Sequence, residues 1–171
     1  MYKRQTAVCE ITQGYGRGSS ELGIPTANVA RENGKIGGLG SSSFDELPTG
    51  IYWGFCRIGT DAHVYKTACS IGFNPTYGNK TKTVEPHLIA PKEDDRRHKS
   101  SCGESILGDF YDQTIRLTLV GYLRPELPFE GLEKLIQAIK NDITETELLA
   151  EDSADETAAK EKAWVGCESG V

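Results

Sequence analysis

The segment QGYGRGSSELGIPTAN, residues 13–28, places glycines close to side chains that carry hard oxygen atoms. Its glycines alternate at Gly14, Gly16 and Gly18. Alternating glycines let a backbone approach a phosphate group closely, because no Cβ stands in the way. The spacing matches neither a P-loop nor a dinucleotide-binding motif. The glycines therefore indicate either a phosphate-binding loop or an ordinary series of turns.

The end of this segment, PTAN, has an oxygen pattern that suits a divalent cation. Thr26 and Asn28 lie two residues apart, so in an extended chain their side chains point to the same side. Their hydroxyl and amide oxygens are hard neutral ligands, and Mg²⁺ completes such a shell with water and substrate phosphates. The alternative interpretation is a turn that the two side chains cap.

A second segment, VEPHL at residues 84–88, contains a candidate general base. Glu85 precedes Pro86, and proline cannot donate to a sheet, so it marks an edge or a bulge. A carboxylate at such an edge could accept a proton from an attacking hydroxyl or orient it. The alternative is an exposed glutamate on an edge strand. His87 is open to the same two interpretations, and a lone histidine is more often structural.

A third segment, GYLRPELPF at residues 121–129, could bind a flat ring. Arg124 lies near Tyr122 and Phe129, and a guanidinium plane with aromatic faces can stack on a planar ring system. The alternative is a connection from a strand to a helix with a surface arginine. Taken separately, the three segments leave the function open.

The elements that must position these segments are mainly strands. Five segments have the composition or alternation of β-strands, at residues 6–11, 50–58, 63–71, 83–89 and 115–123. Period-two patterning with turn signals between the segments predicts an antiparallel barrel or sandwich. The order of elements has no β–α–β alternation, which argues against a parallel doubly wound sheet.

Helical periodicity replaces the strand pattern near residue 132. Apolar residues recur at Leu132, Leu135, Ile136, Ile139 and Ile143, with Glu133, Lys134, Lys140 and Asp142 on the opposite face. This pattern predicts an amphipathic helix that packs on the barrel. The acidic, alanine-rich chain after Leu149 could form a second helix or fray, and Trp164 and Val165 could hold it against the body.

Length and composition predict a single domain over residues 1–171, with its core at about 6–149. Residues 91–105 are charged and predict a surface insertion, and residues 150–171 form an acidic tail. The net charge of −6 argues against a nucleic-acid-binding protein. No apolar run approaches the roughly 20 residues that span a bilayer, and the N-terminus lacks the apolar region of a signal peptide.

Cysteine usage indicates a reducing compartment. The chain has an odd number of cysteines, 5, and no C-x-x-C pair, which is typical of neither a zinc site nor a disulfide framework. Cys9, Cys56 and Cys69 each lie in an apolar run, so we expect them to be small buried hydrophobic residues. The cytoplasm is the simplest location.

In their order along the chain and in their amino-acid sequences, these segments resemble the riboflavin kinase family. The resemblance runs through GYGRGSSELGIPTANV, TGIYWGF, SIGFNPTYGNKTKTVEPHLI, DFYDQTIRLTLVGYLRPE and LEKLIQAIKNDI, and covers about residues 8–143. It implies a six-stranded antiparallel Greek-key β-barrel with a C-terminal helix packed on it. It also implies an enzyme that transfers the γ-phosphate of ATP to the 5′-hydroxyl of riboflavin, giving FMN and ADP.

The resemblance also implies residue roles. Glu85 would be the catalytic carboxylate, and Thr26 and Asn28 would bind Mg²⁺, or Zn²⁺ in its place. The residues implied around the flavin are Arg124, Leu127 and Phe129. The residues implied around ATP are Gly14, Gly16, Arg17, Gly18, Ser20, Thr26, Leu88, Ala90 and Tyr111.

The sequence departs from the family pattern at three places. Ser20 stands where members often carry a lysine that reaches the phosphates, and Arg17 could replace that charge. Pro86 replaces a common threonine, and the 91–105 insertion is longer than usual. Nothing resembles an adenylyltransferase domain, so we do not expect FAD synthesis.

Two other classes of protein stay open at this point. A non-catalytic flavin carrier would need the ring site at Arg124 but neither the PTAN pair nor Glu85. An oligonucleotide-binding barrel would need basic strands with interleaved aromatic residues, which the acidic balance opposes. We expect small-molecule substrates, no nucleic acid, no membrane and a monomer.

Overall fold

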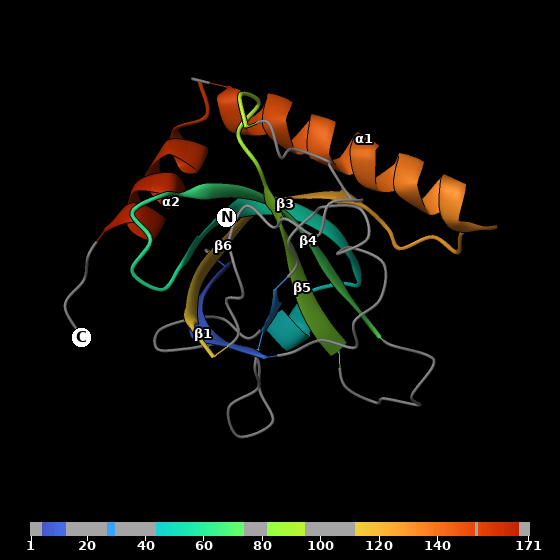
Figure 1. Ribbon diagram of the computed structural model, residues 1–171, viewed down its shortest axis with the longest axis horizontal. Helices are drawn as coiled ribbons and strands as arrows, with labels where there is room; N and C mark the ends of the chain where they lie inside the picture. Colours follow the sequence, from blue (N-terminus) through green and yellow to red (C-terminus); the bar gives the residue numbers. More distant parts are fainter. Residues whose placement is uncertain are drawn as a thin grey trace.

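The computed structural model describes residues 5–12, 27–29, 44–73, 82–94, 112–152 and 154–167 (Figure 1). The strands are β1 (Gln5–Thr12), β2 (Asn28–Val29), β3 (Gly50–Ile58), β4 (Tyr65–Phe73), β5 (Lys82–Ile89) and β6 (Thr114–Arg124). The helices are a short 3₁₀ helix, η1 (Phe44–Glu46), and two α-helices, α1 (Leu132–Glu151) and α2 (Glu156–Gly166). None of the helices in this described part is long and apolar enough to cross a membrane.

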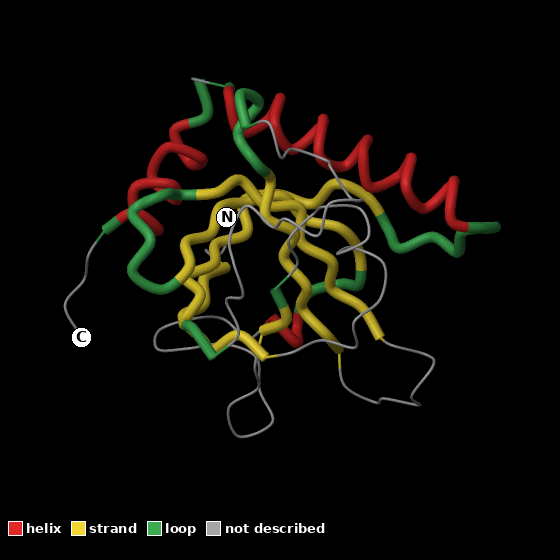
Figure 2. The backbone as a smooth tube through the Cα atoms, in the orientation of Figure 1, coloured by secondary structure: helices red, strands yellow, loops and turns green. Residues whose placement is uncertain are grey.

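The strands form one antiparallel sheet in the order β2-β1-β6-β3-β4-β5. Strands β3, β4 and β5 follow one another, and β6 returns to lie beside β3, which is the Greek-key arrangement. The two ends of the sheet meet where the backbone N–H of Ala27 donates to the carbonyl of Pro86 at 2.9 Å. The sheet therefore curls into a nearly closed barrel (Figure 2), which confirms the predicted fold class.

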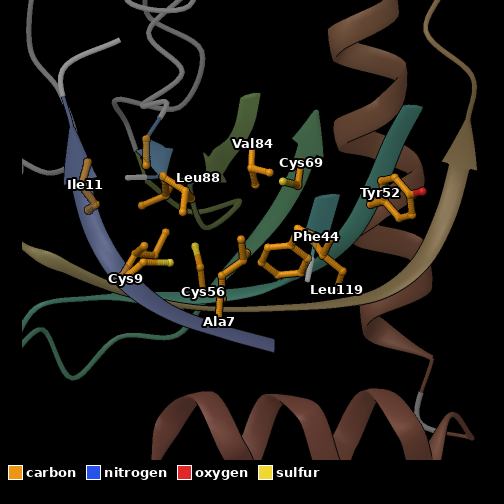
Figure 3. Packing of buried hydrophobic residues seen from close by; sticks show 14 of the residues in the cluster. Ala7, Cys9, Ile11, Phe44, Tyr52, Cys56, Cys69, Val84, Leu88 and Leu119 are labelled. Atoms are coloured by element: carbon orange, nitrogen blue, oxygen red, sulfur yellow. The ribbon is translucent and has the colours of Figure 1, made fainter. Parts of the chain in front are cut away.

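The core fills the inside of this barrel with side chains that alternate along each strand. It contains Ile11 from β1, Leu88 from β5 and Leu119 from β6, together with Phe44 from η1 (Figure 3). The buried cysteines are Cys9, Cys56 and Cys69. Burial raises the pKa of the Cys56 thiol to about 12, so this side chain stays an uncharged apolar group. The predicted role of these three cysteines is confirmed.

Helix α1 crosses the outer face of β3 and β4 (Figure 1). Its central turns pack Ile139 and the buried Ile143 against Ala68 of β4 and Ile89 of β5. Its first turns reach past the strands, so Leu132 is 54% exposed. The predicted apolar face is therefore buried only where the barrel lies beneath it.

The sequence analysis did not decide whether a second helix follows residue 149. Helix α2 does form, and it covers the outer face of β3 and β6. The buried Val165 packs with Trp53 and Phe55 of β3. The side chain of Asp155 caps the helix by accepting from the N–H groups of Thr157 and Ala158 at 2.9 Å each. At the other end, arginines of the barrel satisfy free carbonyls: Arg116 donates to Trp164 and Cys167, and Arg57 to Gly166 and Cys167. The sequence predicted one C-terminal helix and left a second one open, and the described residues form both.

Candidate active site

A cavity of about 250 Å³ lies between the outer face of β4 and β5, the segment after β6, and helix α1. Its lining residues are Ile51, Ala68, Ser70, Glu85, His87, Arg124, Glu126, Leu127, Phe129, Leu135, Ile139, Asp142 and Ile143. Glu85 and Arg124 thus line one space, although they were predicted from separate segments. Leu127 and Phe129 line it too. The candidate base and the candidate ring-binding residues therefore share one site.

The alternation of β5 directs Glu85 out of the barrel and into this cavity. Val84 and Pro86 on either side are buried on the inner face, so Glu85 between them must face outward. In the register of β4 and β5, Glu85 lies opposite Ser70, which also lines the cavity. The carboxylate is half-buried, so it is within reach of a ligand in the cavity.

The start of β2 brings Ala27 and Asn28, the described end of the PTAN segment, to the same part of the barrel. The hydrogen bond from Ala27 to Pro86 joins the residue before Asn28 to the residue after Glu85. Ala27 and Val29 are buried in the core, so Asn28 faces outward, as Glu85 does. Two segments that are far apart in the sequence therefore meet on one outer surface.

Asn28 has the chemistry that a divalent cation needs. Within the described residues no hydrogen bond engages its side-chain amide, so Oδ1 is available as a hard oxygen ligand. Thr26 lies outside the described residues. No group of three or more histidine, cysteine, aspartate or glutamate side chains in the described ranges could hold a metal ion. The part of the PTAN pair that the structure describes fits the metal site that the sequence predicts.

An ion pair between strand and helix fixes the position of Arg124. Its Nε and Nη2 atoms donate to Oδ1 and Oδ2 of Asp142 at 2.7 Å each, and Nη1 donates to the carbonyl of Pro125 at 3.1 Å. The bidentate geometry holds the guanidinium plane in one orientation. Its Cζ atom lies 5.6 Å from the centre of the Phe129 ring. The pair therefore presents a fixed cation beside an aromatic face.

The prediction for Asp142 was wrong. The helical pattern placed it on the solvent face of α1, whereas its side chain is only 7% exposed and faces Arg124. The reason is that a carboxylate can be buried at a helix–sheet contact when a guanidinium there supplies both charge and hydrogen bonds.

Apolar side chains form the wall opposite the strands. Leu127 and Phe129 come from the segment after β6, and Leu135 and Ile139 come from α1. These side chains can cover one face of a planar ring, while the carboxylates and Arg124 bind polar groups of the same ligand.

The cavity changes the pKa of two of its side chains. Burial lowers the pKa of His87 from 6.5 to about 4, so the imidazole is neutral at pH 7. The pKa of Glu126 is raised, first by partial desolvation and then by the nearby negative charge of Glu85, while Arg124 opposes the shift. Glu126 is nevertheless an exposed side chain, so it lies at the open side of the cavity.

Other residues from the sequence analysis lie elsewhere. Leu88 is fully buried in the barrel core, and Ala90 is buried just after β5, so neither lines this cavity. Gly14, Gly16, Arg17, Gly18, Ser20, Thr26 and Tyr111 lie outside the described residues. Their predicted contacts with ATP stay predictions.

Sequence reasoning did not select Ser70, Glu126 or Asp142 as site residues, and it did not select His87 either. Glu126 stands inside the GYLRPELPF segment, two residues after Arg124, and an acidic side chain there was a usable signal. No local signal identified Ser70 or Asp142, because both enter the site only through the pairing of distant elements.

Comparison with known proteins gives one consistent result. The flavokinase family model, described as riboflavin kinase, matches residues 3–150. The riboflavin kinase of Mus musculus is 39% identical over 140 residues, covering 80% of this chain and 74% of the relative. The riboflavin kinase of Homo sapiens is 38% identical over 140 residues and likewise covers 80% of this chain and 74% of the relative. The crystal structure of riboflavin kinase from Trypanosoma brucei has a TM-score of 0.60 at 18% identity, covering 99% of this chain and 94% of that one, and shows the same fold.

Proposed function

The chain belongs to the riboflavin kinase family, and we propose that its cavity binds riboflavin and that Glu85 is the catalytic carboxylate in the ATP-dependent phosphorylation of riboflavin to FMN. One observation supports this assignment of roles: Glu85 shares a single cavity with Arg124, Leu127 and Phe129. A base beside a ring-binding surface is what the reaction requires, because the flavin ring must be held while its terminal hydroxyl reacts.

The chemical step is an in-line transfer of the phosphoryl group. The 5′-oxygen of riboflavin forms a bond to the γ-phosphorus, and the bond from that phosphorus to the β–γ bridging oxygen breaks, releasing ADP. The proton of the 5′-hydroxyl goes to the carboxylate of Glu85. The fixed position of Glu85 on β5 lowers the barrier by orienting the hydroxyl.

Thr26 and Asn28 are the residues that we propose for a divalent cation, with Mg²⁺ as the first choice and Zn²⁺ as the alternative. When bound, such an ion neutralises charge on the phosphates. The outward position of Asn28, beside the residue that follows Glu85, supports this role. The glycine-rich segment at residues 13–20 is proposed to hold the ATP phosphates through backbone N–H groups.

Replacing Asn28 by Ala tests the metal proposal. The variant loses one hard oxygen ligand, so we expect it to need roughly tenfold more Mg²⁺ for half-maximal rate. Titration of the rate with Mg²⁺ and Zn²⁺ measures this change. Asn141→Ala, on the exposed face of α1, is the control, and an unchanged Mg²⁺ requirement in Asn28→Ala would remove Asn28 from the site.

The location and assembly of the protein are further proposals. The buried thiols of Cys9, Cys56 and Cys69 suit a reducing compartment, which supports the cytoplasm. We also propose that the protein is a monomer.

The overall function is tested by incubating the purified chain with riboflavin and Mg·ATP and separating the products by chromatography. We expect FMN and ADP in equal amounts. Riboflavin that is bound but not converted, with Mg²⁺ and with Zn²⁺, would instead identify a flavin carrier. The same mixture without riboflavin measures any ATP hydrolysis.

A further inference from the structure

The carboxylate of Glu126 lies in a place that Gly72 leaves open. Glu126 follows β6 at the open side of the cavity, and its carboxylate rests against the backbone of Gly72 in β4. A Cβ atom built on Gly72 would meet all three atoms of this carboxyl group, with Oε2 at 2.5 Å. Gly72 lies two residues beyond Ser70, which is opposite Glu85, so both residues of β4 face the cavity side. Glu126 is therefore held on the same wall as the catalytic carboxylate.

The charged groups around Glu126 leave it available as an acceptor. Glu85 and His87 of β5, Arg124 at the end of β6 and Asp142 of α1 line the same cavity, and the charges of Glu85 and Arg124 act on Glu126. Arg124 already directs Nε and Nη2 to Asp142 and Nη1 to Pro125, and among the described residues no hydrogen bond reaches the Glu126 carboxylate. Besides Asp142, which is paired with Arg124, the carboxylates of Glu85 and Glu126 line this cavity, and a ligand rich in hydroxyl donors satisfies both.

Riboflavin has such donors between its two ends. Its ribityl chain carries three secondary hydroxyls between the ring and the terminal 5′-hydroxyl. Glu126 lines the same cavity as Leu127, Phe129 and Glu85, so a riboflavin with its ring on the apolar wall and its 5′-hydroxyl at Glu85 places its ribityl chain in the space that Glu126 also lines.

We propose that Glu126 is a specificity-determining residue that accepts hydrogen bonds from the secondary hydroxyls of the ribityl chain. This inference rests on the proposed function, because it assumes that riboflavin occupies this cavity. A site that hydrogen-bonds a substrate hydroxyl discriminates strongly against an analogue that lacks it. Glu126 would therefore select polyhydroxylated side chains over simple hydroxyalkyl chains.

The test combines changes in the enzyme with changes in the substrate. The two substrates are riboflavin and a flavin whose N10 substituent is a 5-hydroxypentyl chain, which keeps the terminal hydroxyl and lacks the secondary ones. Glu126→Ala removes the carboxylate. Gly72→Ala displaces it, because the new methyl group occupies its position, and the displaced atoms are the end of a flexible side chain. Glu133→Ala, at an exposed position of α1, is the control.

We expect Glu126→Ala to lower kcat/KM for riboflavin by about 10- to 100-fold and to leave the hydroxypentyl flavin within about threefold. Gly72→Ala should show the same selective loss, and Glu133→Ala should show none. Equal losses for both substrates would overturn the inference, because they would mean that Glu126 acts on the fold or on Glu85. No loss for either substrate would overturn it too.

Fluorescence titration of both flavins, without nucleotide, separates this inference from the proposed function. If the wild-type chain makes no FMN, but Glu126→Ala weakens the binding of riboflavin alone, the kinase role fails and Glu126 keeps its role in recognition. If turnover is normal and neither kcat/KM nor Kd shows the selective loss, the kinase role stands and the inference on Glu126 fails. Thermal unfolding of each variant identifies any that does not fold.

Discussion

The charge state and orientation of single side chains in the cavity are set by the residues and elements around them. His87 is neutral because burial disfavours its charged form, and Arg124 is fixed because Asp142 accepts two of its hydrogen bonds. Glu85 needs only the alternation of β5 to face the cavity. The charge state of His87 and the position of Arg124 therefore depend on neighbouring elements, whereas the direction of Glu85 depends on its own strand.

The low pKa of His87 predicts a pH-dependent stability. Between pH 6.5 and about 4 the unfolded chain binds a proton at this histidine and the folded chain does not. The free energy of unfolding therefore falls as the pH falls through this window, by at most about 3 kcal/mol from this residue. His87→Gln removes the effect and should have a flatter pH dependence.

Urea unfolding followed by tryptophan fluorescence at pH 7, 5.5 and 4.5 measures the difference. His63→Gln, at an exposed histidine, is the matched control and should follow the wild type. Parallel curves for the wild type and His87→Gln would contradict the assignment of a buried neutral imidazole.

Residue types in local context predicted part of the site. Glu85 was found from its place before Pro86, and Arg124 from its aromatic neighbours, because those signals lie within a few positions. Asp142 was misplaced because a charged residue on a helix normally faces water, and its partner is 18 positions away. The pair is visible only when β6 and α1 are placed together.

At the scale of elements, strands with clear alternation were predictable and short or irregular ones were not. The segment predicted at 50–58 coincides with β3, and the other four predicted strands differ from the observed ones by one or two residues at their ends. Strand β2 has only 2 residues, too few for periodicity to appear. Helix α2 was left open because capping by Asp155 and contacts from Arg57 and Arg116 stabilise it more than its own pattern does.

The contact between β3 and β6 predicts a strict need for glycine at position 54. The strand register shifts between Trp53 and Gly54, and a Cβ on Gly54 would meet the Thr118 carbonyl, with its carbon at 2.9 Å. These obstructing atoms are backbone, so they cannot rotate away. We expect Gly54→Ala to lower the free energy of unfolding by about 2–3 kcal/mol or more.

Chemical denaturation measures this loss. Gly166→Ala is the control, because its new Cβ would lie 3.4 Å from Val64 Cγ2, an ordinary contact, and its stability should change by less than about 0.5 kcal/mol. Equal stability of Gly54→Ala and the wild type would show that the strands do not approach so closely.

At the scale of the whole molecule, the cavity exists because a helix lies across the outside of a nearly closed barrel. The inside of the barrel is filled by the core, so a ligand must bind on the outer face. Helix α1 provides the second wall, and the Arg124–Asp142 pair joins it to the end of β6. Fold and site therefore depend on the same helix–barrel contact.

Asp142→Asn tests this dependence. The change removes the charge and one of the two hydrogen bonds to Arg124, which leaves a partly buried guanidinium without its counter-ion. We expect a loss of about 2–4 kcal/mol in stability and a KM for riboflavin that rises at least fivefold more than the KM for ATP. Denaturation and steady-state kinetics give both values.

Glu145→Gln, on the exposed face of α1, is the control for Asp142→Asn. A normal riboflavin KM in Asp142→Asn, together with normal stability, would mean that the ion pair does not shape the cavity.

The measurement that tests the central claim most directly is the turnover of Glu85→Gln beside its affinity for riboflavin. Glutamine keeps the size of the side chain and cannot take the proton of the 5′-hydroxyl. We predict that kcat falls by about 10²- to 10⁴-fold while the Kd for riboflavin, measured by flavin fluorescence, changes by less than about threefold. Glu133→Gln should behave as the wild type. A kcat for Glu85→Gln close to the wild-type value would contradict the account, because the reaction would then not depend on the carboxylate in the cavity.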